Sequence, residues 1–541
     1  MKDIVQVFAD LSTKEMQNKV FAQLDKEYTY AQLYKDVSHL VGVFKANSLV
    51  EGDRIILSSK NNYAVGSIFL ACLRYGVTTV LLDPDVGPVR ANELIDICQP
   101  KGFFVDQRLE VEWSLDARLA FSFPLIQGGR KKGKLFKKML GGKKKGKTEG
   151  DKTYPEVLQS FPAEALPSTV DPATIAYILF TSGTTSVPKA VQISHRALWA
   201  NLDTINEVYR LNADSRIFNI LTTYHTDGAI QGPVLAALNK ATWYHPMEFS
   251  VDQIPRIFDS IYKYRITHFI TVPTMLAFLH KFSEGFEDSF SGEEFKYIVT
   301  SASPFEKSLW ESFEQTFSTE VVNNYGLTET VAGASYCGPD ADTRKVGSIG
   351  KPIGCSFKIV DEAGNELGPN ERGELLIQGP NMLTSYLNNK EATKAAIKDG
   401  WFYTGDFAER DENGFYQLIG RKKNLIITGG INVQPEEVSA IINTHPAVQE
   451  SVCIGQKDEL FGERVVACVV LESGQQVESS ALIDFCRQEL EPAKVPSQLF
   501  FVPALPKTIS GKIQVRAVEE LIRTGNTIAT GQQNTFMDGI L

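Results

Sequence analysis

Hydroxyl, glycine and lysine residues are gathered in one segment whose composition suits phosphate binding. Residues 176–180 read AYILF, as in a buried strand, and residues 181–189 then read TSGTTSVPK. Hydroxyl groups and backbone N–H groups can donate hydrogen bonds to phosphate oxygens, and Lys189 adds a positive charge. The Walker A spacing is absent, since Ala190 follows Lys189. Taken alone, this composition is more typical of an ordinary turn, so its interpretation depends on the segments that follow.

Five further segments along the chain carry side chains suited to a nucleotide. Aromatic rings can stack on a base, carboxylates can accept from ribose hydroxyls or bind a hard cation, and lysine can contact phosphate. In order, these segments are NNYGLTET at 323–330, WFYTGD at 401–406, GRKKN at 420–424, GGINV at 429–433 and PKTISGKI at 506–513. Any one of the six segments could arise by chance, but six in this order could not.

Together the six segments resemble the adenylate-forming superfamily, which groups acyl-CoA synthetases, nonribosomal peptide synthetase adenylation domains and luciferases. The resemblance covers most of the chain. It implies an enzyme that uses ATP and Mg²⁺ to convert a carboxylic acid into an acyl-AMP, with release of pyrophosphate. The acyl group would then pass to a phosphopantetheine thiol, either of CoA or of a separate acyl-carrier protein.

The resemblance also implies a role for individual residues. Tyr325 would stack on adenine, Thr328 would contact the α-phosphate, and Glu329 would bind Mg²⁺. Asp406, which we expect in a tight turn, would accept hydrogen bonds from the ribose hydroxyls, and Arg421 would contact the ribose or phosphate side. The full set of implied ATP-binding residues is Thr181, Ser182, Gly183, Thr184, Thr185, Lys189, Asn324, Tyr325, Gly326, Thr328, Asp406, Arg421 and Lys512.

Lys512 resembles the family's catalytic lysine, and Thr181 and Glu329 are implied to act with it. Adenylation brings a carboxylate onto the α-phosphorus of ATP, so a cation between the two anions would stabilise the transition state. Lys423 stands where the family has its hinge, about which the C-terminal domain rotates between two poses. In the second pose, Gly429 and Gly430 would line the channel for the thiol arm, because glycine lets a chain approach the backbone closely.

The class of acid is left open by residues 222–228, TTYHTDG, which the resemblance places at the acid pocket. His225 is typical of acyl-CoA synthetases for fatty or other organic acids. Asp227 instead favours an amino acid, because a buried carboxylate is stabilised by an ammonium group and is costly beside an alkyl chain. The alternative is therefore a stand-alone amino-acid adenylation enzyme that loads a separate carrier protein. A solvated or capping role for Asp227 is equally compatible with the sequence.

The elements that must position these residues alternate between strand and helix. Residues 51–82 read as strand, helix and strand, with Gly76 at the end of the helix, and apolar strands recur up to residue 300. This pattern predicts an α/β fold with parallel or mixed sheets. Short runs between 346 and 420 predict an antiparallel β subdomain. We expect a large adenylation core over 1–420, a hinge near 421–423, and a small mobile α+β domain over 424–541.

Composition sets the remaining limits. The chain has 541 residues and a formal net charge of −10, which argues against general nucleic-acid binding. Its first residues show no secretory signal, and no run approaches the roughly 20 apolar residues of a membrane span. Seven scattered cysteines form no C-x-x-C pair, so neither zinc nor a disulfide framework is indicated. We expect a cytoplasmic enzyme.

One segment departs from this acidic composition. Residues 130–147 carry ten Lys or Arg and no acid. A solvated insertion is one interpretation. The other is a short basic amphipathic helix, with Leu135, Phe136, Met139 and Leu140 on one face, that holds the enzyme peripherally at the anionic inner face of a membrane.

Overall fold

A computed structural model describes residues 15–23, 26–115, 121–125, 154–181, 188–428, 431–458, 461–508 and 513–524. Two units are distinguished by the contacts within them. The first holds Met1–Gly347, Pro352–Ser356 and Gln378–Gly400, and the second holds Ser348–Lys351, Phe357–Ile377 and Trp401–Leu541. The basic segment 130–147 lies outside the described residues.

The first unit contains a seven-stranded sheet in the order β18-β8-β7-β4-β3-β5-β6. Its strands are β3 (Arg54–Ser58), β4 (Thr78–Leu81), β5 (Gly102–Asp106), β6 (Phe121–Leu125), β7 (Ile175–Thr181), β8 (Lys189–Ser194) and β18 (Ser385–Tyr386). β6, β5, β3, β4 and β7 are parallel, whereas β8 and β18 are antiparallel additions. Every residue of β4 and β5 is buried, as expected for strands covered on both faces.

The strand–helix–strand prediction for residues 51–82 is confirmed in detail. The helix α3 (Asn62–Tyr75) begins at Asn61, whose side chain accepts from the Ala64 N–H, and ends at Gly76. Gly76 has φ of +82° and donates its N–H to the carbonyl of Cys72. A left-handed residue after the last helical turn favours glycine, which has no Cβ to clash.

A second sheet of the first unit runs β14-β13-β12-β11-β9-β10-β1-β2. These strands are β1 (Lys19–Ala22), β2 (Glu27–Thr29), β9 (Arg216–Asn219), β10 (Thr242–Tyr244), β11 (His268–Thr271), β12 (Tyr297–Thr300), β13 (Val321–Tyr325) and β14 (Ser335–Cys337). The six from β13 to β1 are parallel, so their carboxyl ends meet at one edge. The α/β prediction is therefore correct.

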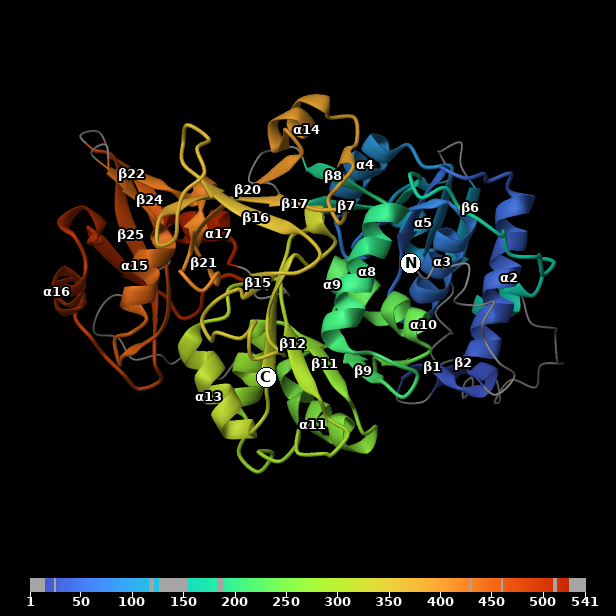
Figure 1. Cartoon of the computed structure of the whole chain (residues 1–541), viewed down its shortest axis with the longest axis horizontal. Coiled ribbons are helices and arrows are strands. Elements are labelled where there is room, and N and C mark those ends of the chain that lie inside the picture. Colours follow the sequence, from blue (N-terminus) through green and yellow to red (C-terminus); the bar gives the residue numbers. More distant parts are fainter. Residues whose placement is uncertain are drawn as a thin grey trace, which may run out of the picture. The chain divides into compact units, whose positions relative to one another are not determined.

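Helices cover the faces of these sheets, and Figure 1 shows β11 and β12 beside α11 and α13. The longer helices of the unit are α2 (Tyr30–Ala46), α4 (Pro88–Cys98), α8 (His195–Tyr209), α11 (Ile254–Lys263), α12 (Pro273–Lys281) and α13 (Lys307–Phe317). Behind β11, the rings of Phe258, Phe290, Phe313 and Phe317 pack on one another. This apolar packing fixes the strands whose ends carry the motif residues.

The second unit begins with antiparallel strands, as the sequence between 346 and 420 predicts. They are β16 (Ser356–Val360), β17 (Arg372–Gln378), β20 (Trp401–Arg410) and β21 (Tyr416–Arg421), of which β17 and β21 pair with β20. A smaller sheet follows, with β22 (Ile426–Thr428), β23 (Ile431–Val433), β24 (Val448–Asp458), β25 (Gly462–Leu471) and β26 (Gln498–Phe501).

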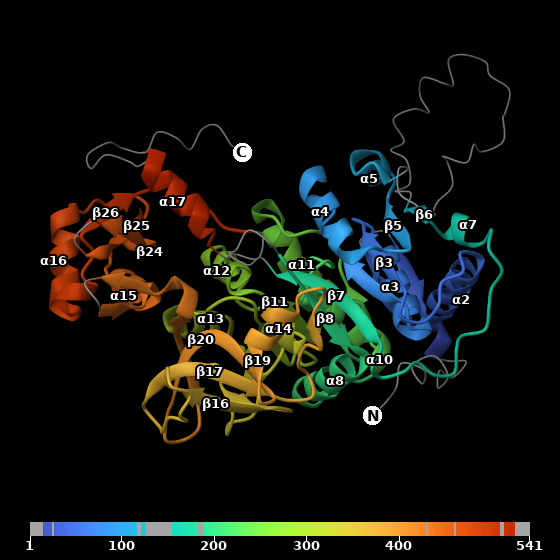
Figure 2. The same cartoon turned by 90° about the horizontal axis from the view of Figure 1, so that it is seen from above.

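Successive side chains of β25 point to opposite faces of this smaller sheet and pack against helices on both faces. Val465, Ala467 and Val469 pack with residues of α15 (Pro435–Ile442) and α16 (Ser479–Glu489). The intervening Val466 and Cys468 pack with Val518 of α17 (Val515–Thr524). Figure 2 shows α16 and α17 on opposite sides of the strands. The α+β character predicted for this part of the chain is confirmed.

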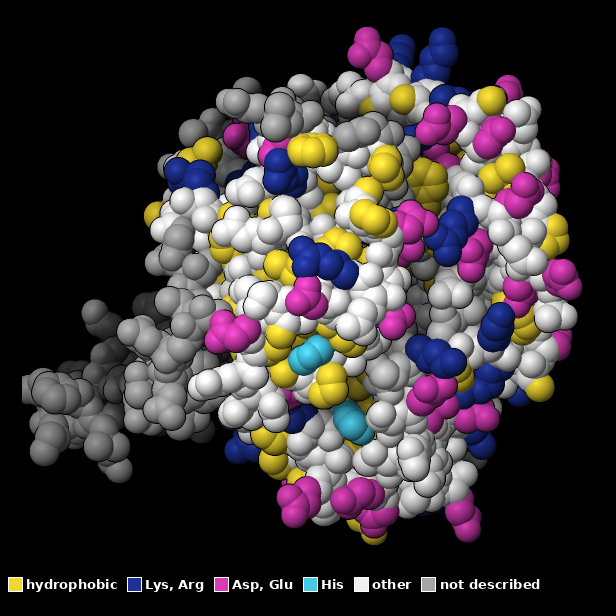
Figure 3. Space-filling view, turned by 90° about the vertical axis from the view of Figure 1, so that its left-hand side faces the viewer, with side chains coloured by type: hydrophobic (Ala, Val, Ile, Leu, Met, Phe, Trp, Pro, Cys, Tyr) yellow, Lys and Arg dark blue, Asp and Glu magenta, His cyan; other side chains and the backbone are white. Residues whose placement is uncertain are grey.

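The surface charges, the cysteines and the helix lengths have no unusual feature among the described residues. Acidic and basic side chains are interspersed on the face shown in Figure 3, with hydrophobic side chains between them. All seven cysteines are free thiols. Among the described helices, none combines the length and the apolar character that crossing a membrane requires.

Candidate active site

The predicted phosphate loop connects two paired strands. Thr181 ends β7, Lys189 begins β8, and the two residues are partners in the antiparallel register. The loop therefore starts and ends at the same end of the paired strands β7 and β8. Its residues Ser182, Gly183, Thr184 and Thr185 lie outside the described residues.

Lys189 and Glu329 are brought together by Tyr386, a residue that the sequence interpretation missed. The Nζ of Lys189 lies 4.9 Å from the centroid of the Tyr386 ring, within the range of a cation–π contact. The Tyr386 hydroxyl donates to Oε1 of Glu329 at 3.0 Å. Burial, with the neighbouring carboxylate, raises the pKa of Tyr386, so its hydroxyl stays protonated and remains a donor. The Lys189 ammonium and the Glu329 carboxylate thus contact the same tyrosine and do not contact each other.

Tight backbone geometry follows β13 and holds the motif around Tyr325. A Cβ at Gly326 would lie 2.4 Å from the Ala332 carbonyl oxygen, so only glycine fits there. The φ angles of Val331 and Ala332 are +57° and +72°. A β-branched residue in this region is strained, and such strain is often found at functional sites. The turn holds Thr328 partly exposed and Glu329 buried.

The loop after β9 carries His225 and Asp227, and it is tightly folded. A Cβ at Gly228 would lie 2.1 Å from the Thr222 carbonyl oxygen. His225 is exposed to solvent, although the protein around it lowers its pKa. Asp227 lies in the short helix α9 (Thr226–Ala229) and is partly exposed. Its Oδ1 accepts from Gln231 Nε2 at 2.5 Å and from Ser301 Oγ at 2.9 Å.

Burial raises the pKa of Asp227, and the two hydrogen bonds from Ser301 and Gln231 act in the opposite direction. Both partners donate to the carboxylate, which favours its charged form. The hydrogen bonds from Ser301 and Gln231 thus fix the orientation of the Asp227 carboxylate. A hydrogen bond from its own backbone N–H also acts to lower the pKa of Asp227.

In the second unit, Asp406 and Arg421 form an ion pair. They face each other across β20 and β21, with Arg421 Nε 2.6 Å from Asp406 Oδ1. Only 3% of the Asp406 side chain is exposed. The predicted tight turn at Asp406 is wrong, since Asp406 lies within the long strand β20. Gly405, with φ of +71°, and irregular register on both sides bend the strand there as a bulge does.

Glu374 links the Asp406 segment to the predicted hinge and was also missed. Its Oε1 accepts from the Gly405 N–H at 3.2 Å, and its Oε2 accepts from Lys422 Nζ at 2.7 Å. Lys423 follows in a short helical turn, Lys422–Asn424, and its side chain is exposed. Gly429, Gly430 and Lys512 lie outside the described residues.

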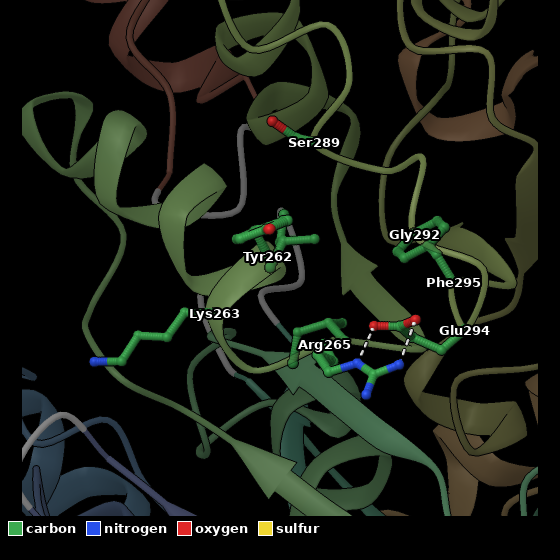
Figure 4. Close-up of a pocket in the computed structure, with 9 residues that line it drawn as sticks. Tyr262, Lys263, Arg265, Ser289, Gly292, Glu294 and Phe295 are labelled. Atoms are coloured by element: carbon green, nitrogen blue, oxygen red, sulfur yellow. Dashed lines mark hydrogen bonds and ion pairs between the residues drawn. The ribbon is translucent and has the colours of Figure 1, made fainter.

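A cavity of about 420 Å³ lies elsewhere in the first unit (Figure 4). It is lined by the end of α11, by Arg265 and Ile266, and by residues 289–295. Arg265 and Glu294 form a two-point ion pair at this cavity, with distances of 2.8 and 3.2 Å. None of the predicted site residues lines it.

Comparisons with known proteins agree with this architecture. The AMP-binding enzyme family matches residues 9–387, and the AMP-binding enzyme C-terminal domain matches residues 437–512. The indoleacetate–CoA ligase of Aromatoleum aromaticum is 29% identical over 508 residues, covering 92% of this chain and 94% of that protein. The oxalate–CoA ligase of Arabidopsis thaliana is 34% identical over 349 residues, covering 64% and 67%. The 2-succinylbenzoate–CoA ligase of Geobacillus kaustophilus is 28% identical over 501 residues, covering 91% and 93%.

Solved structures share the fold. ATP-bound MatB from Rhodopseudomonas palustris matches with a TM-score of 0.85 at 24% identity, covering 96% of this chain and 99% of that one. The O-succinylbenzoate CoA synthetase of Bacillus subtilis, in complex with ATP and magnesium ion, matches with a TM-score of 0.78 at 24% identity, covering 95% and 98%.

Two sheets with a phosphate-type hairpin at one edge, followed by a separate α+β unit, define a nucleotide-binding enzyme of the adenylate-forming class. The chain belongs to the AMP-binding enzyme family. It is an AMP-forming acid–thiol ligase.

The Tyr386 contact generates a prediction about metal dependence. Tyr386→Phe keeps the ring beside Lys189 but removes the hydroxyl that donates to Glu329. The family resemblance implies that Glu329 binds Mg²⁺. Loss of a hydrogen bond to a metal ligand typically weakens metal binding by about tenfold or more. We therefore expect the Mg²⁺ concentration for half-maximal ATP–pyrophosphate exchange to rise about tenfold. Tyr297→Phe is the matched control, because its hydroxyl donates to the Val208 carbonyl away from these residues. Identical Mg²⁺ curves for both variants would contradict a role for Tyr386.

Proposed function

We propose that this enzyme activates an organic acid with ATP and transfers the acyl group to CoA. The observation that carries the proposal is the Lys189–Tyr386–Glu329 cluster, which joins the phosphate hairpin to the segment after Tyr325. A cation and a carboxylate, each held by the same buried ring, suit the binding of a triphosphate with its metal. The three relatives described above are each named as a CoA ligase, which supports CoA as the acceptor.

ATP binding and acid attack are assigned to this chain's own residues. Tyr325 stacks on adenine, and Thr181, Lys189 and the loop between them hold the phosphates. Glu329 fits a Mg²⁺ site, since it is a buried carboxylate beside a phosphate-binding cation, and the metal would neutralise phosphate charge. Lys512 stabilises the charge that develops when the acid carboxylate attacks the α-phosphorus.

Ribose recognition is assigned to the Asp406 pair. The register of β20 and β21 already orients the Asp406 carboxylate through Arg421. Asp406 would accept the ribose hydroxyls and Arg421 would contact the ribose or phosphate side. Because Asp406 is buried, a hydrogen bond gained there avoids competition from bulk water.

Thiol transfer is assigned to the second pose of the C-terminal residues, with the hinge near 421–423 and domains over 1–420 and 424–541. The segment around Gly429 and Gly430 would then line the thiol channel. Ile427 and Ile431 lie on either side of these glycines and are 53% and 48% exposed. Phe461 precedes Gly462, the partner of Thr428 in the sheet, and is 47% exposed. Exposed apolar groups on these two neighbouring turns favour a surface that meets another surface during turnover. The alternative is that the enzyme activates an amino acid and transfers it to the thiol of a separate carrier protein.

Product analysis tests the function directly. With an accepted acid, ATP should yield AMP and pyrophosphate, and adding CoA should yield an acyl-CoA thioester. Lys512→Ala should lower acid-dependent pyrophosphate exchange by about 10²–10³-fold, as when one preorganised donor is removed. The same variant should still convert a supplied acyl-adenylate and CoA into acyl-CoA, because Lys512 acts in the first pose alone. ADP as the stoichiometric product would overturn adenylation, and equal loss of both half-reactions would overturn the two-pose mechanism.

A second proposal concerns the basic segment 130–147, which we interpret as a peripheral tether to an anionic membrane surface. Its ten positive charges lie in a chain of net charge −10, and it is far in sequence from the site residues. On either side of it, Leu125 and Tyr154 are buried in the first unit. Each basic residue near an anionic bilayer contributes about 1 kcal/mol. A cytoplasmic enzyme would thereby be held at the inner membrane face.

Vesicle co-sedimentation tests the tether. The intact protein should bind anionic vesicles, should release them as salt shortens the Debye length, and should not bind neutral vesicles. A variant lacking 130–147 should lose vesicle binding and keep its pyrophosphate exchange. Equal sedimentation of both proteins would contradict the tether.

A further inference from the structure

The turn after β13 is held by two buried asparagines from different parts of the first unit. Asn201 lies in α8 and is 1% exposed, and Asn381 lies shortly before β18 and is 3% exposed. Their Nδ2 atoms donate to the same carbonyl oxygen, that of Gly333, at 2.8 and 2.7 Å. Both also reach the Thr330 carbonyl oxygen, at 3.5 and 3.3 Å. Because a carbonyl oxygen can only accept, each amide must present its NH₂ group to the turn.

Hydrogen bonding by these two amides consists of donation to the turn. In the described part of the chain, neither Asn201 Oδ1 nor Asn381 Oδ1 has a hydrogen-bond partner. The Asn381 oxygen packs over Gly379, where a Cβ would lie 2.7 Å from it and 2.5 Å from the Cβ of Cys355. Glycine at position 379 thus leaves the room that the Asn381 side chain needs to face the turn.

The turn needs support because its backbone is strained. Val331 and Ala332, which lie between the two accepting carbonyls, have φ of +57° and +72°. Residues other than glycine adopt this region at a cost in energy and persist there only where the surrounding contacts hold them. Ala332 also donates its N–H to the Leu327 carbonyl at 3.1 Å, which closes the turn around Thr328 and Glu329. Loss of both amide donors would therefore let the turn that carries Glu329 change its conformation.

Both asparagines are attached to β8, the strand that Lys189 begins. α8 follows β8 in the chain without an intervening loop. β18 pairs with β8, and between Asn381 and β18 the Leu383 N–H donates to the Glu329 carbonyl at 2.7 Å. The turn that carries Glu329 is thus tied to the strand of Lys189 along two routes, one through each asparagine.

We propose that Asn201 and Asn381 are positioning residues that hold Glu329 at a fixed place relative to Lys189. The proposal rests on the function above, in which Glu329 binds Mg²⁺ and Lys189 binds phosphate. Neither asparagine has to touch the nucleotide, since each acts through the backbone of residues 330–333. Because the two donors share their acceptors, either one holds the turn in part when the other is lost, and the double loss frees it.

Hydrogen exchange tests the support of the turn in the absence of any ligand. Peptides covering residues 325–335 should exchange faster when Asn201→Ala and Asn381→Ala are combined, because the strained turn opens more often. Each single variant should show a smaller increase, and the two increases should sum to less than that of the double variant. Asn47→Ala is the matched control, because it removes an amide that donates to the Val43 carbonyl at the end of α2, and it should leave exchange at 325–335 unchanged.

Nucleotide binding tests whether the support reaches the metal site. The Kd of ATP would be measured by calorimetry with saturating Mg²⁺ and again with EDTA, without an acid substrate. The factor by which Mg²⁺ tightens ATP binding should fall about tenfold in the double variant, as when supporting contacts of a metal ligand are lost. Ala332→Gly should restore part of this factor, because glycine adopts positive φ without strain and needs less support. Without that recovery, relief of backbone strain would be excluded as the role of the asparagines.

The outcomes separate this inference from the proposed function. Unchanged exchange at 325–335 in the folded double variant would overturn the support of the turn. Faster exchange with an unchanged effect of Mg²⁺ on ATP binding would overturn the positioning of Glu329. Where the double variant does not fold, Asn381→Ala takes its place with smaller changes of the same kind expected, and no change would overturn the inference. Failure of every acid to support pyrophosphate exchange in the intact protein would instead overturn the proposed function itself.

Discussion

When parallel strands are buried on both faces, polar side chains can reach a ligand only at the ends of the strands. The positions of the candidate site residues depend on this constraint. The interior positions of β4 and β5 are buried without exception. Polar side chains that act on a ligand must therefore stand where strands end. Thr181 ends β7, Ser301 follows β12, and Asn324 lies at the end of β13. Apolar packing behind the strands sets the position of each of these groups before any ligand binds.

Lys189 and Glu329 both contact Tyr386 and do not contact each other directly. A direct ion pair between Lys189 and Glu329 would satisfy both groups and leave neither for phosphate or metal. The Tyr386 ring accepts the cation on its face and the Tyr386 hydroxyl donates to the carboxylate. Neither contact is an ion pair, so the triphosphate and metal that we propose to bind here would not have to break one between Lys189 and Glu329.

Sequence reasoning identified what depends on neighbours along the chain, and it missed what depends on pairing between distant strands. The helix ending at Gly76 and the strand after it follow from local composition. Tyr386 could not be predicted, because its contact with Glu329 spans 57 residues and requires β18 to pair with β8. Glu374 was missed for the same reason. The hydrogen bond that Asp227 accepts from Ser301 likewise depends on a residue 74 positions away in the sequence.

The position of Asp406 in a strand has a physical consequence for the ribose contact that we propose for it. A carboxylate in a flexible turn would lose conformational entropy each time it bound a ligand. In β20 it is held by its cross-strand partner Arg421, and the bulge at Gly405 is fixed by Glu374. Glu374 also accepts a hydrogen bond from Lys422, which lies within the predicted hinge near 421–423. The same carboxylate thus anchors both the segment around Asp406 and Lys422. The rotation that we propose about Lys423 would leave these two contacts of Glu374 intact.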